Sequence, residues 1–161
     1  MGIEHDIKQK AFQTEYQKVF INVAYTNSYL TTMMNTFLKK YDVSMQQYNV
    51  LRIARGQHPN PTTVSMITDR MIDKMSNASR LVDKLQLKEL LERKQCSSDK
   101  RQVDVHITTR GLELLNEIDQ FMSEFEAQLS HVSLERAALL NDILDEIRNN
   151  INTKTEWKKE T

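Results

Sequence analysis

Six polar and cationic side chains between residues 74 and 84 have a spacing that suits contact with DNA. Asn77, Arg80 and Lys84 fall at positions i, i+3 and i+7, so a helix would carry them on one stripe. Cations on such a stripe can contact phosphates, and short polar side chains near its start can bond base edges. The predicted DNA contacts on this helix are Lys74, Ser76, Asn77, Ser79, Arg80 and Lys84. The alternative is the solvated face of a core helix, because charged helix faces are common.

A polar loop downstream carries the second set of candidate contacts. Residues 96–101 join two runs, 90–95 and 102–108, that we predict to be strands, since apolar and polar residues alternate in the second run. The predicted DNA contacts in the loop are Asp99, Lys100 and Arg101. Arginine is favoured in a narrow minor groove, where the negative potential is deep. We therefore expect Arg101 beside the minor groove, with Asp99 holding its guanidinium in place.

A helix-turn-helix followed by a β-hairpin would position both sets. Thr63 is predicted to cap the first helix, and Asp73 the second, because their side chains can accept free N–H groups of the first turn. The buried face of the second helix is predicted to consist of Met75, Ala78, Leu81, Val82 and Leu85. This order of elements from Pro61 to Gly111 is typical of a winged helix-turn-helix, whose second helix normally enters a major groove.

The same block resembles the MarR family (multiple antibiotic resistance regulators). Five family motifs have counterparts here, in order and without gaps: Thr63-Val64 with Ile67-Thr68, Ser76-Asn77-Ala78-Ser79-Arg80-Leu81-Val82-Asp83-Lys84-Leu85, Leu90-Leu91-Glu92-Arg93, Asp99-Lys100-Arg101, and Ile107-Thr108-Thr109-Arg110-Gly111. Each motif alone is weak, but five in register make a specific match. Two positions depart from the pattern. Glu89 stands where the family usually ends its recognition helix with glycine, which reaches positive φ cheaply, and Ile72 replaces a small turn residue.

Long amphipathic helices are predicted on both sides of the winged part. Residues 10–40 and 110–128 carry apolar stripes at three-to-four spacing, and Thr108 is predicted to cap the second of these helices. A last helix extends from a cap at Ser133 to Ile151. The stripe of residues 10–40 is wider than a small winged domain can cover. The resemblance implies that these helices interlock two chains into a homodimer, whose two-fold axis matches a palindromic operator.

The predicted fold class is mainly α with a small β-wing. The chain is interpreted as a single domain over residues 1–161, with a winged helix-turn-helix at about 44–110 and dimerisation helices at about 5–40 and 110–151. Ser44, with glutamine three residues later, has the spacing of a capping box and opens the helix that ends before a glycine.

Composition supports a helical protein of the cytoplasm. Only 3 of the 161 residues are glycine and 2 are proline. No run resembles a membrane span, the N-terminus is too polar for a secretory signal, and a single cysteine excludes an intramolecular disulfide framework. Net charge is zero, but residues 70–110 hold ten Lys or Arg against six Asp or Glu, whereas residues 111–150 hold two against nine. A basic module beside an acidic one favours a single DNA-facing surface.

Nothing in the sequence favours catalysis or a bound cofactor. There is no glycine-rich phosphate loop and no G-x-S-x-G motif, so we predict no enzyme and no cofactor. No metal-ligand spacing relates the histidines, which are His5, His58, His106 and His131. Cys96 lies near cations that could stabilise a thiolate, so a thiol-based redox sensor and a bystander thiol are both open. In MarR-like sensors the reactive cysteine usually lies in the N-terminal helix, where this chain has none.

The function predicted from these patterns is a sequence-specific DNA-binding transcriptional regulator. The resemblance implies a repressor that responds to a small aromatic or anionic effector. Candidate residues around that effector, chosen because aromatic and cationic groups gather near the junction of the first two helices, are Tyr25, Tyr29, Met33, Tyr41, Tyr48 and Arg52. The alternative from another class is a helical interaction or scaffold protein, because a winged fold does not fix its function.

Overall fold

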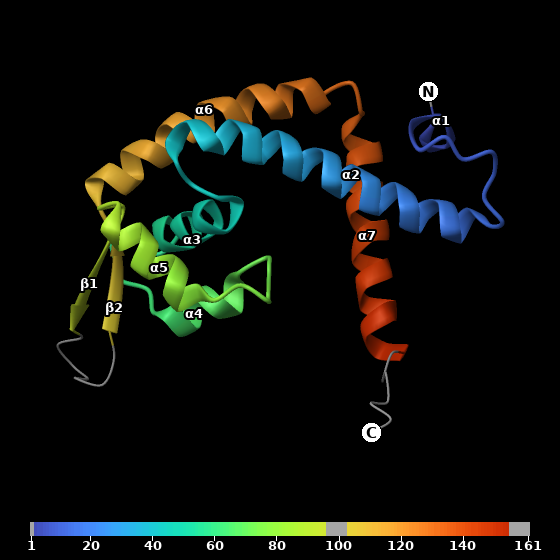
Figure 1. Cartoon of the computed structure of the whole chain (residues 1–161). Helices are drawn as coiled ribbons and strands as arrows, with labels where there is room; N and C mark the ends of the chain where they lie inside the picture. The colour runs from blue at the N-terminus through green and yellow to red at the C-terminus, as the bar shows by residue number, and fades with distance from the viewer. Residues whose placement is uncertain (1, 96–102, 155–161) are drawn as a thin grey trace. The chain divides into compact units, whose positions relative to one another are not determined.

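The computed structural model describes residues 2–95 and 103–154 (Figure 1). Its helices are α1 (Ile3–Asp6), α2 (Glu15–Leu38), the 3-10 helix η1 (Lys39–Tyr41), α3 (Met45–Arg55), α4 (Val64–Arg70), α5 (Ala78–Leu87), α6 (Thr109–Leu129) and α7 (Leu134–Lys154). Its strands are β1 (Leu91–Gln95) and β2 (Val103–Ile107). This mainly helical architecture with a small antiparallel sheet confirms the predicted fold class. The chain divides into two compact units, one ending at Ile118 and the other beginning at Asp119.

Helix α2 begins later than the predicted helix of residues 10–40. Thr14 caps it, because its hydroxyl accepts the N–H of Gln17 at 3.1 Å, and the residues just before it are not helical. Only the end of α2 enters the core of the first unit, through Met34, Phe37 and Leu38. The earlier turns leave large apolar side chains exposed: Tyr16, Val19, Phe20, Val23, Tyr25, Tyr29 and Leu30.

Helix α3 is the central element of the first unit. The predicted capping box is present: the Gln47 N–H donates to Ser44 Oγ at 3.2 Å, and the Ser44 N–H donates to Gln47 Oε1 at 3.0 Å. The helix ends before Gly56, as predicted. It contacts α2, α4, α5 and β2. Its buried side chains therefore form the middle of the core, with Tyr48, Val50, Leu51 and Ala54.

The sheet consists of β1 and β2, and the segment before α4 forms an isolated β-bridge to β2. Leu91 lies opposite Ile107, and Arg93 opposite Val105. Thr62 and Val105 also exchange two backbone hydrogen bonds, of 2.9 and 2.8 Å. Thr63 then caps α4 by accepting the N–H of Met66 at 3.2 Å, as predicted. The start of α4 is thus attached to the base of the wing.

The junction between α5 and β1 explains one departure from the family pattern. Glu89 has φ 59°, so it occupies the left-handed conformation that glycine adopts at low cost. The Glu89 N–H bonds the carbonyl of Gln86, and the Leu90 N–H bonds that of Leu85. These two bonds form a Schellman motif, and Leu90, the residue after the left-handed position, is buried. The glutamate therefore ends the helix in the way a glycine would.

The start of α6 is fixed to this junction. Thr108 caps α6, as predicted: its hydroxyl accepts the Gly111 N–H at 3.0 Å and donates to the Glu89 carbonyl at 2.7 Å. A Cβ on Gly111 would lie 2.4 Å from the Leu90 carbonyl oxygen and 2.8 Å from Ile107 Cγ1. Glycine is therefore required where α6 passes the base of β1.

The second unit contains the end of α6 and all of α7. Ser133 caps α7, as predicted, by accepting the Arg136 N–H at 3.4 Å. Large apolar side chains of α7 are exposed in the single chain: Leu134, Leu139, Leu140, Ile143 and Ile151. Within residues 2–95 and 103–154, no helix has the length and apolarity needed to cross a membrane.

Candidate nucleic-acid interface

The cap of helix α5 is Asn77, four residues beyond the Asp73 cap predicted from the sequence, and the helix itself starts at Ala78. The Asn77 Oδ1 accepts the Arg80 N–H at 3.0 Å, and the backbone of Asn77 is extended. Asparagine and aspartate are equally good caps, so the prediction of Asp73 was wrong because a second suitable residue follows it. Asp73 instead closes the turn before the helix.

The turn before α5 is organised by the carboxylate of Asp73. Its Oδ1 accepts the Met75 N–H at 3.0 Å, and its Oδ2 accepts the Ser76 hydroxyl at 2.7 Å. The Ser76 hydroxyl and the Met75 N–H hold the pKa of Asp73 below its ordinary value, because both donate to the ionised form. The predicted DNA contact Ser76 therefore orders the turn, and its hydroxyl proton is already committed to Asp73.

The later start of α5 changes its buried face. Ala78, Val82 and Leu85 are buried as predicted, and Leu81 is half-buried. Met75 was expected on that face, but its side chain is 94% exposed. It precedes the helix, so helical spacing does not apply to it.

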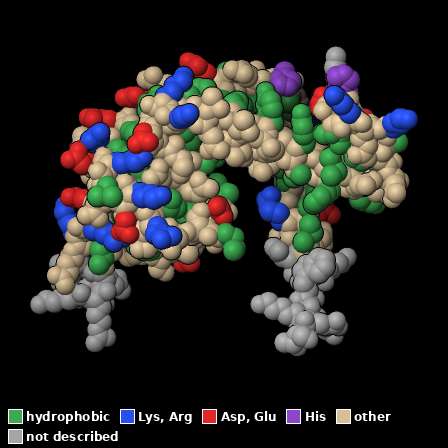
Figure 2. Space-filling model, in the orientation of Figure 1, with side chains coloured by type: hydrophobic (Ala, Val, Ile, Leu, Met, Phe, Trp, Pro, Cys, Tyr) green, Lys and Arg blue, Asp and Glu red, His purple; other side chains and the backbone are tan. Residues whose placement is uncertain are grey.

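The face of α5 opposite the core carries the predicted polar stripe. Asn77, Ser79, Arg80 and Lys84 are all exposed, and Lys74 stands exposed in the turn before them. The Lys74 ammonium donates to the Asp69 carbonyl at the end of α4, at 2.6 Å. Figure 2 shows Lys and Arg side chains over the face formed by α5 and the strands, with acidic side chains among them. The structure thus brings the five exposed candidates of this helix together on one accessible surface.

Arg93 on β1 ties the wing to α5, and the sequence analysis did not single it out. Its Nη2 lies 2.8 Å from Asp83 Oδ1 and donates to the Ser79 carbonyl at 3.3 Å. The arginine side chain is half-buried but the Asp83 carboxylate is exposed, so solvent screens the pair and its main effect is to position the two elements. Asp83 and Arg93 both belong to the matched motifs, but they are ten positions apart across a helix end, and that spacing gave no sign of contact.

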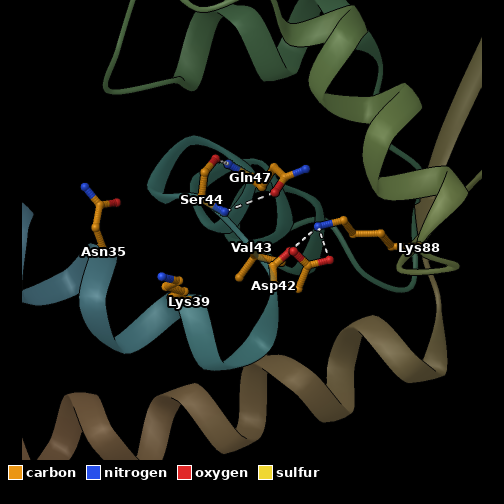
Figure 3. Close-up of a pocket in the computed structure, with 7 residues that line it drawn as sticks. All are labelled: Asn35, Lys39, Asp42, Val43, Ser44, Gln47 and Lys88. Carbon is orange, nitrogen blue, oxygen red and sulfur yellow. Dashed lines mark hydrogen bonds and ion pairs between the residues drawn. The ribbon is translucent and has the colours of Figure 1, made fainter.

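A second link joins the end of α5 to the segment between α2 and α3 (Figure 3). The Lys88 ammonium lies 2.9 Å from Asp42 Oδ2 and also donates to the Asp42 carbonyl. Asp42 has φ 54°, a conformation that aspartate tolerates better than most residues. A surface hollow surrounds this pair and is lined by Asn35, Lys39, Asp42, Val43, Ser44, Gln47 and Lys88.

The candidate effector residues do not form one cluster in the single chain. Tyr25, Tyr29 and Met33 line one shallow hollow along α2, together with a serine and a threonine. Tyr48 is buried in α3, with the Arg52 guanidinium carbon 5.9 Å from the centre of its ring. Tyr41 instead stacks at a tilt on the Phe37 ring, at 5.4 Å between centroids. Tyr41 also borders a different hollow, beside Lys88 and Leu114, from the one that Tyr25, Tyr29 and Met33 line.

The predicted wing-tip contacts Asp99, Lys100 and Arg101, and the thiol of Cys96, lie outside the described residues. In the described ranges, no three His, Cys, Asp or Glu side chains stand close enough to hold a metal ion. Helix α5 therefore presents a polar, cation-bearing face. Ion pairs tie it to β1, through Asp83 and Arg93, and tie its C-cap Lys88 to Asp42.

Known proteins resemble this chain in sequence and share its fold. Residues 43–103 match the family model described as MarR family. The chain is 27% identical over 131 residues to the HTH-type transcriptional regulator MhqR of Bacillus subtilis (strain 168), across 81% of this chain and 89% of that protein. The crystal structure of a MarR transcription factor from Planctomyces limnophilus has 26% identity and a TM-score of 0.62, covering 84% of this chain and 98% of that one. The S. aureus MepR–DNA complex has 20% identity and a TM-score of 0.69, covering 88% and 99%.

Proposed function

The chain belongs to the MarR family of transcription regulators, which are not enzymes, and from this premise we propose a homodimeric repressor that a small molecule releases from DNA. DNA binding is the common activity of this class, and the solved relative from S. aureus is a complex with DNA. The observation that carries the proposal is the exposed stripe of α5, opposite a buried face that fixes its orientation. The protein would act in the cytoplasm, where its operator lies.

Arg80 offers the direct test of the DNA surface. Its exposed guanidinium on α5 should contact the duplex, so Arg80→Ala should weaken operator binding and reduce the slope of affinity against salt by about one charge per half-site. Arg148→Ala is the matched control, because Arg148 is also exposed but is paired with Asp145 on α7. Both variants are titrated with a duplex selected by the full-length protein from a random pool. Equal effects of the two substitutions would contradict the assignment.

Asn77 separates helix capping from base contact. Asn77→Ala removes the cap, at a cost of about 1 kcal/mol, as well as any base contact. Asn77→Ser keeps a capping oxygen but loses the amide, so it should leave thermal stability nearly unchanged. We expect Asn77→Ser to shift the preferred operator sequence, with a loss on the order of 1–3 kcal/mol on the original site if a bidentate base contact is removed. An unchanged sequence preference would place Asn77 in a purely structural role.

The wing tip is proposed to reach the minor groove through Arg101, with Asp99 orienting its guanidinium. Removing an acid near DNA should tighten binding if only its charge matters. We predict the opposite for Asp99→Ala, namely weaker binding, because the arginine loses its partner. A variant that binds its operator more tightly would refute this role, and Arg101→Ala provides the reference for complete loss of the contact.

A second copy of the chain is proposed to cover the apolar side chains that α2 and α7 leave exposed. Phe20 is 70% exposed and Tyr16 is 88% exposed on α2, which is costly for large apolar groups gathered on one helix. Sedimentation should show a dimer at micromolar concentration. Phe20→Glu should dissociate it, whereas Asn27→Glu, an exposed polar control on the same helix, should have less effect. A folded wild-type monomer would contradict the proposal.

The effector is proposed to be a small aromatic anion near Tyr29 and Arg52, which the assembly of two chains would have to bring into one site. Binding to the folded protein should raise the melting temperature and weaken operator affinity by the same coupling. Substituted benzoates are suitable probes, with Tyr29→Ala as the variant that should lose the response. A benzoate that stabilises the protein without changing DNA affinity would contradict induction by this class of ligand.

A further inference from the structure

The side chain of Met75 has no role in the fold or in the surface described so far. At 94% exposed it is the most exposed large apolar residue of the described chain, and it immediately precedes Ser76 and the cap of α5. Isolated apolar side chains on a surface are ordinary. Met75 differs because it stands at the start of the helix that is expected to enter the major groove.

The backbone beneath Met75 is held by hydrogen bonds on both sides. The Met75 N–H donates to Asp73 Oδ1 at 3.0 Å, and the Ser76 N–H donates to the Asp73 carbonyl at 3.2 Å. One residue earlier, the Ile72 N–H donates to Asn49 Oδ1 of α3 at 3.0 Å. The turn is therefore anchored to α3, so the backbone position of Met75 is set before any partner binds.

The chemistry of the major groove narrows what an apolar group there can contact. Phosphates and most base edges offer only polar atoms, and the C5-methyl group of thymine is the apolar exception. Methionine suits such a contact, because its unbranched, polarisable side chain adapts to irregular surfaces. Residues at the N-terminal end of a recognition helix are those that reach base edges.

We propose that Met75 packs against a thymine C5-methyl group in each operator half-site and so helps to determine sequence preference. This inference rests on the DNA-binding function proposed above. Met75 thereby adds an apolar contact to the hydrogen bonds expected from Asn77 and Arg80. Leu87 is the natural comparison, since it is 86% exposed but ends α5, about 15 Å along the axis from the start of the helix.

The test removes single methyl groups from the DNA. A duplex is selected from a random pool by the full-length protein, and each thymine is then replaced in turn by deoxyuridine. For the wild type we expect one thymine per half-site whose methyl loss weakens binding about three- to fivefold, the effect expected for burying one methyl group. Met75→Ala should bind the original duplex more weakly by a similar factor and should be insensitive to that replacement.

Three further variants complete the experiment. Met75→Leu should retain the methyl dependence, because it keeps an apolar side chain, and Leu87→Ala should retain it because it lies at the other end of α5. Melting temperatures should be unchanged for Met75→Ala, since the side chain packs against nothing in the chain. The proposal would be overturned if Met75→Ala still bound more weakly when that thymine methyl group is removed. It would also be overturned if Ile72→Ala, and not Met75→Ala, became insensitive to the removal. Failure to select any duplex would contradict the DNA-binding function itself.

Discussion

Replacing Gly111 with alanine should destabilise the protein, although alanine is the better helix former. A Cβ at this position would lie 2.4 Å from the Leu90 carbonyl oxygen and 2.8 Å from Ile107 Cγ1, so backbone and core must both shift. Overpacking of this kind costs about 1–3 kcal/mol, and the helix propensity of alanine returns about 1 kcal/mol. The expected net loss is therefore up to about 2 kcal/mol, with a central value of about 1 kcal/mol, or roughly 2–4 °C in melting temperature for a chain of this size.

Gly56 supplies the matched control for that substitution. It ends α3 with φ −64°, and a Cβ there would lie 3.5 Å from the carbonyl oxygens of Arg52 and Ile53, an ordinary contact. Gly56→Ala should therefore raise stability by about 0.4–1 kcal/mol, through the unfolded state. Both variants are measured by calorimetry at one protein concentration, because the stability of an oligomer depends on concentration. A Gly111→Ala protein at least as stable as the wild type would refute the close approach of α6 to β1.

Three other substitutions or titrations test local features. Glu89→Gly should be more stable than Glu89→Ala by about 0.5–1 kcal/mol in thermal unfolding. Both variants lose the exposed ion pair with Arg110, but only glycine relieves the left-handed backbone. Equal stabilities of the two variants would argue against that conformation. Thr62→Val should be neutral or stabilising by about 1 kcal/mol in denaturant unfolding, because the buried Thr62 Oγ1 has no hydrogen-bond partner; a clear loss of stability would reveal one. The Asp73 carboxyl, followed by NMR, should titrate below its ordinary pKa. Its stabilisation of the turn is therefore fully present above the pKa of the unfolded chain and is lost as the pH falls through the pKa of the folded protein. Ser76→Ala should raise that pKa, and an unchanged titration would exclude the hydroxyl as the main cause.

The sequence predicted those features that depend on short-range spacing. The capping box at Ser44, the caps at Thr63 and Thr108 and the alternation in β2 each follow from side chains acting within a few residues. Their partners lie nearby in the chain, so the competing possibilities are few. Helical spacing also acts over a few residues, and it correctly predicted that the polar stripe of α5 lies on the exposed face of that helix.

Local signals failed where two residues could perform the same role. Asp73 and Asn77 can both cap a helix, and spacing alone cannot decide between them because the turn between α4 and α5 has no fixed length. Because Asn77 is the cap, α5 starts later than predicted. Met75, which was expected in the core, therefore precedes the helix and is exposed. Contacts between distant elements, such as Lys88 with Asp42, had no sequence signal at all.

The paired hydrogen bonds between Thr62 and Val105 connect parts of the chain that are 43 positions apart. The segment that joins α3 to α4 is thereby held to the wing by an isolated β-bridge. Opening the wing at Val105 must break bonds at both positions, so their amide protons should exchange with solvent at similar rates. The middle of β2 and the start of α4 would then belong to one cooperative opening unit, so the helix-turn-helix and the wing would lose protection together at this point.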